Sequence, residues 1–201
     1  VNRWVTELDL ADKQEANWRT RAKDVEARYR DEQVDNARPG RYSNGKRFNI
    51  LYSNVQTICP TLYNQSPTPD VRRRYRDADP VGKEVCEVLE RCLSFTMDEC
   101  DFDRYMRLAV KDQQLCGRGV TRVRYNPAFA DETDEMSGDS YESLQGEEVK
   151  FEHVGWPDFR HGPGKTWEQV QWVAFRHLMT RDELRAKFGD DLGNEVQLDY
   201  S

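Results

Sequence analysis

The chain has 201 residues, of which 37% are hydrophobic and 33% are charged, and its 37 acidic and 30 basic side chains give a formal net charge of −7. No apolar run approaches the ~20 residues that a membrane-spanning helix needs, and residues 1–10 lack the apolar core of a signal peptide. We therefore expect a protein that is neither embedded in a membrane nor secreted. Leu, Ile, Val and Phe together number only 40, so the five Trp and nine Tyr must supply much of a thin core.

The charged residues are distributed unevenly along the chain. Residues 38–76 contain eight basic side chains against one acid, Asp70. Residues 131–148 contain eight acids and no Lys or Arg. The sequence is therefore bipolar. Its Gly, Ser, Asp and Glu content favours a solvated, disordered loop over 131–148.

The first predicted element is one long amphipathic helix. Apolar residues recur at steps of three and four from Trp4 to Tyr29, and only Glu15 interrupts the stripe. A helix over residues 3–31 would be about 43 Å long at ~1.5 Å per residue. That is enough to lie across a neighbouring molecule, although packing on its own domain is the favoured interpretation. We assign residues 1–37 to this helix.

Residues 38–118 are expected to form a mainly helical region. A helix from Phe48 should end or kink near Cys59, because Pro60 removes a backbone donor. The alternation in Val71–Arg76 predicts a short strand with one cationic face.

Two further helices complete this region. Asp79 followed by Pro80 predicts a cap and a first-turn proline. Asp101 is expected to cap the next helix, which Gly117 closes. The apolar face of the first of these helices contains Val81, Val85, Val88 or Leu89, Cys92 and Phe95.

In residues 119–201 the hydrophobic period changes to two. Val120–Tyr125, Val149–Val154 and Val170–His177 are predicted to be antiparallel strands. Thr180 and Glu183 form a capping box that opens a short helix ending at Gly189. Helices followed by strands predict an α+β fold.

Cysteine usage gives no sign of a disulfide framework or a metal site. The count is odd and there is no Cys-x-x-Cys pair, so buried or idle thiols in a reducing compartment are expected. The five residues are Cys59, Cys86, Cys92, Cys100 and Cys116.

Two patterns point weakly to site chemistry. Residues 162–166 resemble the end of a phosphate-binding loop, but the required first glycine is replaced by Phe159 and no helix is predicted to follow. His153, Asp158 and His161 have the side chains of a zinc or iron site, as in a metal-dependent hydrolase. Turn-stabilising hydrogen bonds are the simpler interpretation. We expect no cofactor and no enzymatic activity.

The arginine-rich run 71–76 is a candidate nucleic-acid contact, because arginines neutralise phosphates and tyrosine stacks on bases. The isoelectric point near 5.1 lacks the overall field that attracts polyanions. A nucleic-acid-binding module is therefore the alternative to a protein–protein role.

Several strings over residues 45–190 are similar to the N-terminal region of tailed-bacteriophage portal proteins. They are typical of the family and do not form a catalytic fingerprint. In chain order they are Arg47–Thr57, Pro60–Tyr63, Arg73–Gly82, Glu87–Arg91, Asp101–Asp103, Gly117–Tyr125, Trp156–Phe159, Met179–Leu184 and Phe188–Gly189.

This resemblance implies a structural subunit of a ring of twelve copies at one capsid vertex. It implies assembly in the host cytoplasm into the virion, with terminase, tail or adaptor proteins, head proteins and double-stranded DNA as partners. Portals of this kind are usually at least twice as long, so the resemblance also implies that these residues are the outer wing and that stem, clip and channel parts follow Ser201.

A ring subunit needs complementary surfaces on its two flanks. The charge distribution leads to the hypothesis that the basic run of one subunit faces the acidic segment of the next. The candidate interface residues are Arg72, Arg74, Arg76, Asp131, Glu132, Asp134 and Glu135.

Overall fold

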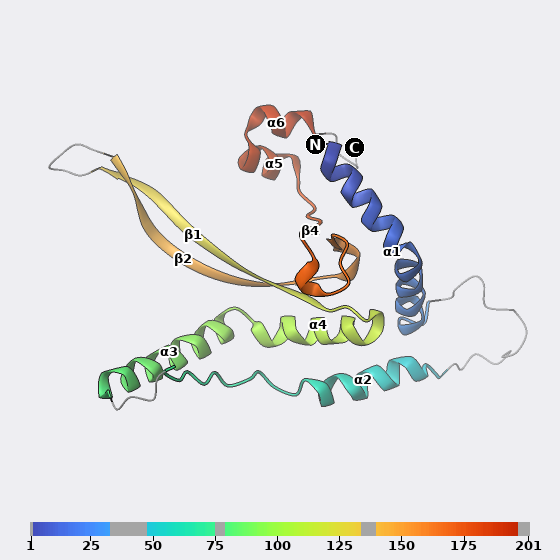
Figure 1. The fold of residues 1–201 in the computed structure, drawn as a ribbon, viewed down its shortest axis with the longest axis horizontal. Coiled ribbons are helices and arrows are strands. Elements are labelled where there is room, and N and C mark those ends of the chain that lie inside the picture. The colour runs from blue at the N-terminus through green and yellow to red at the C-terminus, as the bar shows by residue number, and fades with distance from the viewer. Residues whose placement is uncertain (1, 33–47, 75–78, 134–139, 197–201) are drawn as a thin grey trace, which may run out of the picture. The chain divides into compact units, whose positions relative to one another are not determined.

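The computed structural model describes residues 2–32, 48–74, 79–133 and 140–196, and it confirms the predicted α+β class. The chain divides into two compact units. One comprises residues 12–157, and the other combines residues 1–11 with 158–201. Figure 1 shows the elements of each unit.

The long N-terminal helix is confirmed as α1, Asn2–Tyr29. Its stripe buries small residues, above all Ala22, against Cys116 and Trp156. The indole of Trp18 lies edge-on to Trp156, with ring centroids 5.7 Å apart, and its Nε1 donates a hydrogen bond of 2.9 Å to the carbonyl of Cys116. These residues are the core of the 12–157 unit.

Glu15, which interrupts the apolar stripe, accepts hydrogen bonds from two arginines. Arg19 on the same helix donates over 2.7 Å and Arg118 over 2.5 Å. The guanidinium of Arg118 also lies 4.2 Å from the centroid of the Trp18 ring. The carboxylate is only 14% exposed, so it ties α1 to the end of α4 at the edge of the core.

Helix α2, Ile50–Leu62, continues three residues past Cys59, so the prediction that it ends there is wrong, while the alternative of a kink stays a prediction. Pro60 lies in the last turn, where it deprives only one carbonyl of its donor, and Tyr63 still donates to the Cys59 carbonyl over 3.0 Å. Asn49 caps the helix by accepting from the Tyr52 amide. The same side chain donates to the carbonyl of Arg28, which fixes the start of α2 against the end of α1.

The predicted strand over Val71–Arg76 is also wrong in its described part. Residues 71–73 have no regular structure, Arg74 lies in a bend, and residues 75 and 76 are outside the described residues. The amide of Val71 donates a hydrogen bond of 2.9 Å to the side-chain carboxylate of Glu90 on α3. A strand would instead pair this amide with a backbone carbonyl.

Helix α3, Pro80–Glu99, begins as predicted, with the Asp79 side chain accepting from the Val81 amide. Helix α4, Phe102–Cys116, ends as predicted at Gly117, whose φ is +77°. Asp101 is the N-cap residue of α4 as predicted, but its backbone is left-handed (φ +52°) and its side chain makes no capping hydrogen bond, so that part of the prediction is wrong.

Two long antiparallel strands form a ribbon, β1 Val120–Thr133 with β2 Ser140–Val154. Residues 131–133 and 140–148 are therefore strand, and the prediction of a disordered acidic loop is wrong for them, while residues 134–139 are outside the described residues. Acidic side chains are compatible with strands here because much of the ribbon is exposed. A register shift between Ala128 and Phe129 leaves Gln145 as the extra residue of a bulge.

The second unit contains a short antiparallel pair, β3 Phe159–His161 with β4 Val173–Phe175. The predicted strand over 170–177 is thus reduced to three residues, and β3 was not predicted. Between them lies one turn of 3-10 helix, Trp167–Gln169. Phe159 is buried between Phe175 and Trp167, and Trp4 lies edge-on to Trp172.

The unit ends in α5, Arg181–Phe188, and α6, Asp190–Glu195. The capping box of Thr180 and Glu183 is confirmed, and its amide and hydroxyl hydrogen bonds lower the pKa of Glu183. Gly189 ends α5 with a φ of +85°. The sequence analysis missed α6, whose six residues are too few for a periodic signal.

The Glu15 bonds give a test of this core. Glu15→Leu restores the apolar stripe, yet we expect it to lower the free energy of unfolding by about 2–3 kcal/mol, because it removes the partly buried anion between two arginines. Urea unfolding followed by tryptophan fluorescence measures the change. Glu15→Gln, which keeps an acceptor, should cost less. A Glu15→Leu variant as stable as the parent would contradict the assignment.

Candidate subunit interface

The ribbon has one apolar and one charged face. Cross-strand pairing places Val123 opposite Phe151, and Phe129 opposite Leu144. Because directly opposed residues share a face, these side chains and the Tyr125–Val149 pair form the apolar ribbon face. The other face presents pairs such as Arg122 with Glu152, Arg124 with Lys150 and Asn126 with Glu148.

Among the described residues, α4 and the turn before it cover the base of the apolar ribbon face. Phe151 lies edge-on to Phe102 at a centroid distance of 5.1 Å. The Cys100 thiol donates a hydrogen bond of 2.7 Å to the carbonyl of Val149. Farther out the large side chains are exposed. The exposed fraction is 59% for Val123 and 59% for Phe129. Figure 1 shows this outer part of the ribbon standing apart from α3.

Two carboxylates lie directly opposite each other at the outer end of this face, Asp131 on β1 and Glu142 on β2. Both are exposed, and neither has an ion-pair partner in the described part of the chain. Like charges in this position destabilise a strand pair. Glu147, on the same face, accepts a hydrogen bond from the Tyr125 hydroxyl, which raises the pKa of Tyr125. The end of the apolar ribbon face is therefore an anionic surface.

Helix α3 exposes its apolar side. Its own chain covers the side that contains Gly82 and Glu90, and α3 has no buried residue. The exposed fraction is 64% for Val81 and 67% for Phe95. One face of the helix, which we name the α3 stripe, contains Val81, Val85, Val88, Leu89, Cys92 and Phe95. Large contiguous apolar surfaces of this kind mark interaction sites.

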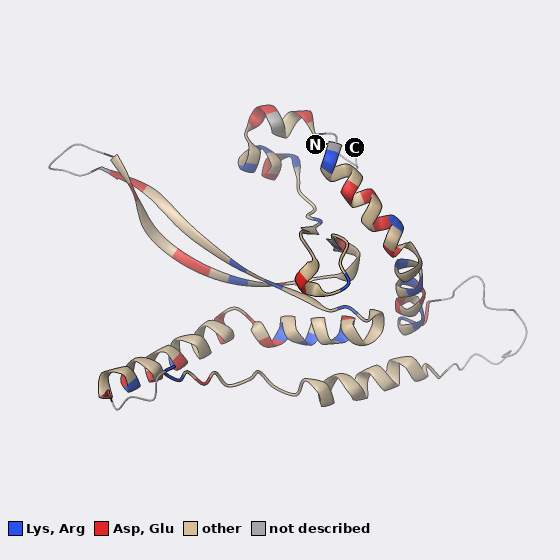
Figure 2. Cartoon of the chain, in the orientation of Figure 1, with Lys and Arg blue, Asp and Glu red and all other residues tan. Residues whose placement is uncertain are grey.

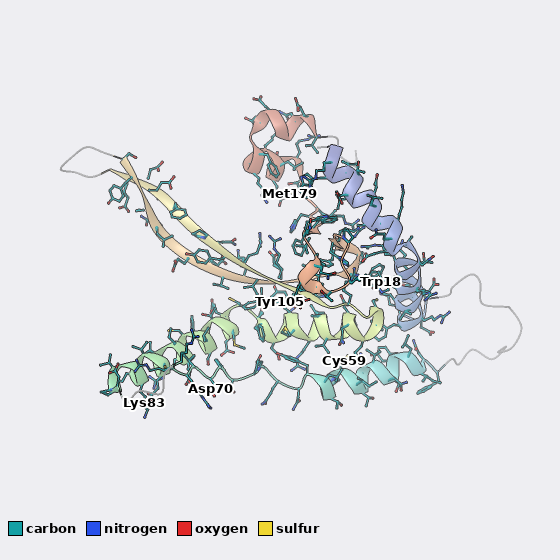
Figure 3. The ribbon with its side chains drawn as sticks, viewed as in Figure 1. Trp18, Cys59, Asp70, Lys83, Tyr105 and Met179 are labelled. Atoms are coloured by element: carbon teal, nitrogen blue, oxygen red, sulfur yellow. The ribbon has the colours of Figure 1, made fainter. Side chains whose placement is uncertain are left out.

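The described arginines of the basic run belong to an extended segment that packs along the covered side of α3. The Arg73 guanidinium packs on Gly82, where a Cβ would come within 2.5 Å of Nη1, and forms an ion pair of 3.3 Å with Asp79. Arg72 forms an exposed ion pair of 2.6 Å with Asp70. Figure 2 shows basic residues on the extended segment that runs beside α3, and Figure 3 labels Asp70 on that segment and Lys83 near the start of α3.

The sequence-predicted interface residues fall into two groups. Arg72 and Arg74 are exposed beside α3, and Asp131 and Glu132 lie at the outer end of β1. Glu132 is on the charged face, where hydrogen bonds from Ser143, and then from Tyr141 and Gln145, lower its pKa. The remaining three, Arg76, Asp134 and Glu135, lie outside the described residues.

The residues of the metal-site alternative each have another partner. His153 pairs with Asp112 over 2.8 Å, within the 12–157 unit. In the second unit Asp158 accepts from Arg176 over 2.7 Å, and His161 lies 2.7 Å from the carbonyl of Gly162. In the described ranges no group of three His, Cys, Asp or Glu side chains is arranged to hold a metal ion.

The loop that resembles a phosphate-binding loop joins β3 to β4. Gly162 donates to the Trp172 carbonyl over 2.9 Å, and the Lys165 amide donates to the Gln169 side chain. One turn of 3-10 helix follows the loop, so an α-helix N-terminus that could bind phosphate is missing there. The hydrogen bonds describe a hairpin connection.

A cavity of about 140 Å³ lies between α2 and α4, with Val55 and Cys59 among its lining residues. Figure 3 shows Cys59 between these helices. Both cations in the lining have partners in the chain, since Arg107 pairs with Asp103, and Lys111 lies 4.9 Å from the Tyr29 ring centroid. The cavity therefore gives no argument for a charged ligand.

Comparison with protein-family models, with curated proteins and with solved structures finds no match to this chain. None of the helices in the described ranges is both long and apolar enough to span a bilayer.

Sequence reasoning missed two features of this surface. It identified the apolar residues of α3 but not that they are exposed, and it ended the first ribbon strand at Tyr125. The signal for the longer strand was present, because the apolar alternation of Val123 and Tyr125 continues to Phe129.

The exposure of the α3 stripe can be tested with iodoacetamide at pH 8. Cys92 is exposed, whereas burial raises the pKa of Cys116 to about 11, which leaves about 0.1% of it as the reactive thiolate. We expect mass spectrometry of single copies to find Cys92 alkylated first and Cys116 only after unfolding. Equal rates at the two thiols would contradict the described packing.

Proposed function

We propose that the chain is a non-enzymatic structural subunit of a bacteriophage portal ring, forming part of the capsid-vertex conduit for genome packaging and ejection. Its first partner is a copy of itself in a dodecamer. The ring would also contact terminase, tail or adaptor proteins, head proteins and the double-stranded DNA that passes through it. The proposed location is the virion, after assembly in the host cytoplasm.

One observation carries the proposal beyond the sequence resemblance: the 12–157 unit has two uncovered apolar surfaces with opposite charges nearby. The apolar ribbon face ends in Asp131 and Glu142, and the helix with the α3 stripe is flanked by the segment that contains the exposed Arg72 and Arg74. Two different complementary surfaces on one subunit permit a head-to-tail contact, which closes into a ring when the rotation allows.

The polar candidates support a structural role as well. His153 and Asp158 are each bound to a neighbouring side chain, in arrangements that fix local structure. The net charge of −7 suits a conduit, because a strongly basic wall would bind the DNA backbone and resist its movement.

Negative-stain imaging and mass photometry of the full-length gene product test the proposal. We expect a ring with an axial hole and a mass of twelve copies. A product that stays monomeric, or that forms only open filaments, at low and physiological salt would overturn it.

A DNA titration over a salt series separates the rival function. The ring proposal expects the free subunit to bind duplex DNA no more tightly than an unrelated acidic protein. A nucleic-acid-binding module would instead show affinity that falls steeply with salt and that is lost in Arg72→Glu/Arg74→Glu. That result, without ring formation, would replace the portal proposal.

A further inference from the structure

We infer that the apolar ribbon face of one copy packs along the α3 stripe of a second copy, with Asp131 and Glu142 beside the arginines at the start of α3. This inference rests on the proposed self-assembly and names the two surfaces that make the contact. It also fixes the direction of the contact, because the acids lie at one end of the ribbon.

The two apolar surfaces match in length. From Val81 to Phe95 the α3 stripe spans fourteen residue steps, or about 21 Å at 1.5 Å per residue. From Val123 to Phe129 the exposed part of the ribbon face spans six steps, or about 20 Å at 3.3 Å per residue. One surface can therefore cover the other along its whole length.

Both surfaces consist of large side chains that one copy leaves uncovered. On the ribbon, Val123, Tyr125, Phe129 and Leu144 are each 49–59% exposed. On α3, five of the six stripe residues are each 46–67% exposed, and Cys92 is also exposed. A helix that lies across a twisted two-stranded ribbon buries both apolar surfaces at once, as the base of the same face already does against Phe102.

The charges determine which end of the ribbon meets which end of α3. The opposed carboxylates of Asp131 and Glu142 lack a cation in the described part of the chain. Arg72, which is 82% exposed and paired with Asp70, and Arg74 flank Arg73 in the chain, and the Arg73 guanidinium packs on Gly82 in the first turn of α3. Pairing the acids with these arginines places the outer ribbon near Val81. Tyr125, about 20 Å from the acids, then lies beside the far part of the α3 stripe, where Cys92 and Phe95 are about 15 Å and about 20 Å from Gly82.

The exposed Cys92 provides the test. In the full-length product, Tyr125→Cys should form a disulfide with Cys92 under mild oxidation by copper phenanthroline. Copies labelled with nitrogen-15 are mixed with unlabelled copies before assembly. We expect mass spectrometry to find the linked peptide with one heavy and one light half in about half of the links.

Asn126→Cys is the matched control, because it places a thiol one residue along on the opposite face of the ribbon. It should give less than a tenth of the link, and Cys92→Ser in the Tyr125→Cys background should abolish it. Equal linking by both variants, or links only within one isotope class, would overturn the inference. Rings that form without the link would also overturn it and leave the portal proposal standing. Linked copies that never close into a ring would support it and contradict the portal proposal.

Charge reversal tests the same contact without a new thiol. Arg72→Glu/Arg74→Glu should weaken assembly at low salt at least tenfold, and Asp131→Arg/Glu142→Arg in the mixed partner should restore it. Arg21→Glu/Lys23→Glu makes the same charge change at exposed residues of α1 and should have little effect. Assembly that is unchanged in Arg72→Glu/Arg74→Glu, or that is lost equally in Arg21→Glu/Lys23→Glu, would overturn the contact.

Discussion

The 12–157 unit depends on the packing of α1 against the end of α4. There, the Trp18 indole donates to the Cys116 carbonyl while Arg118 lies over its ring and binds Glu15. These contacts close a small core, and few other hydrophobic residues are buried in the described part of the chain. A carboxylate at a stripe position is thus part of the core's hydrogen bonding. Removing it would leave two guanidinium groups in partly apolar surroundings.

With so small a core, much of the apolar surface of α3 and the ribbon is left uncovered by the described residues of the unit. Isolated exposed hydrophobic residues are ordinary in proteins, but a whole helix face and a whole strand face are not. In α3 the chain covers the side containing Glu90 and exposes the side containing Val85 and Val88. This inverts the usual orientation of an amphipathic helix, which is the physical reason to treat α3 as half of an interface.

The sequence predicts elements where local chemistry decides them: the Asp79 cap, the Thr180 capping box and the Gly117 end are all confirmed. Sequence-based prediction fails where the structure of a segment depends on contacts with residues far away in the sequence. Alternation at Val71 resembles a strand, but no backbone pairs with it, and the acids near Asp131 resemble a loop, although β2 pairs with them. Periodicity shows which residues of α3 share a face but not what covers that face, so the candidate interface was only partly predictable.

The opposed pair of Asp131 and Glu142 explains why such surfaces suit assembly better than a stable free subunit. Its repulsion weakens the outer ribbon in a single copy, and in the proposed contact a cation from a second copy would remove that cost. Apolar burial would provide most of the attraction, whereas the charges select one orientation and oppose the reverse one, in which the acids would lie near Glu99 at the other end of α3. Direction, more than affinity, is what a head-to-tail ring requires, because a contact that tolerates both orientations cannot close with a fixed number of copies.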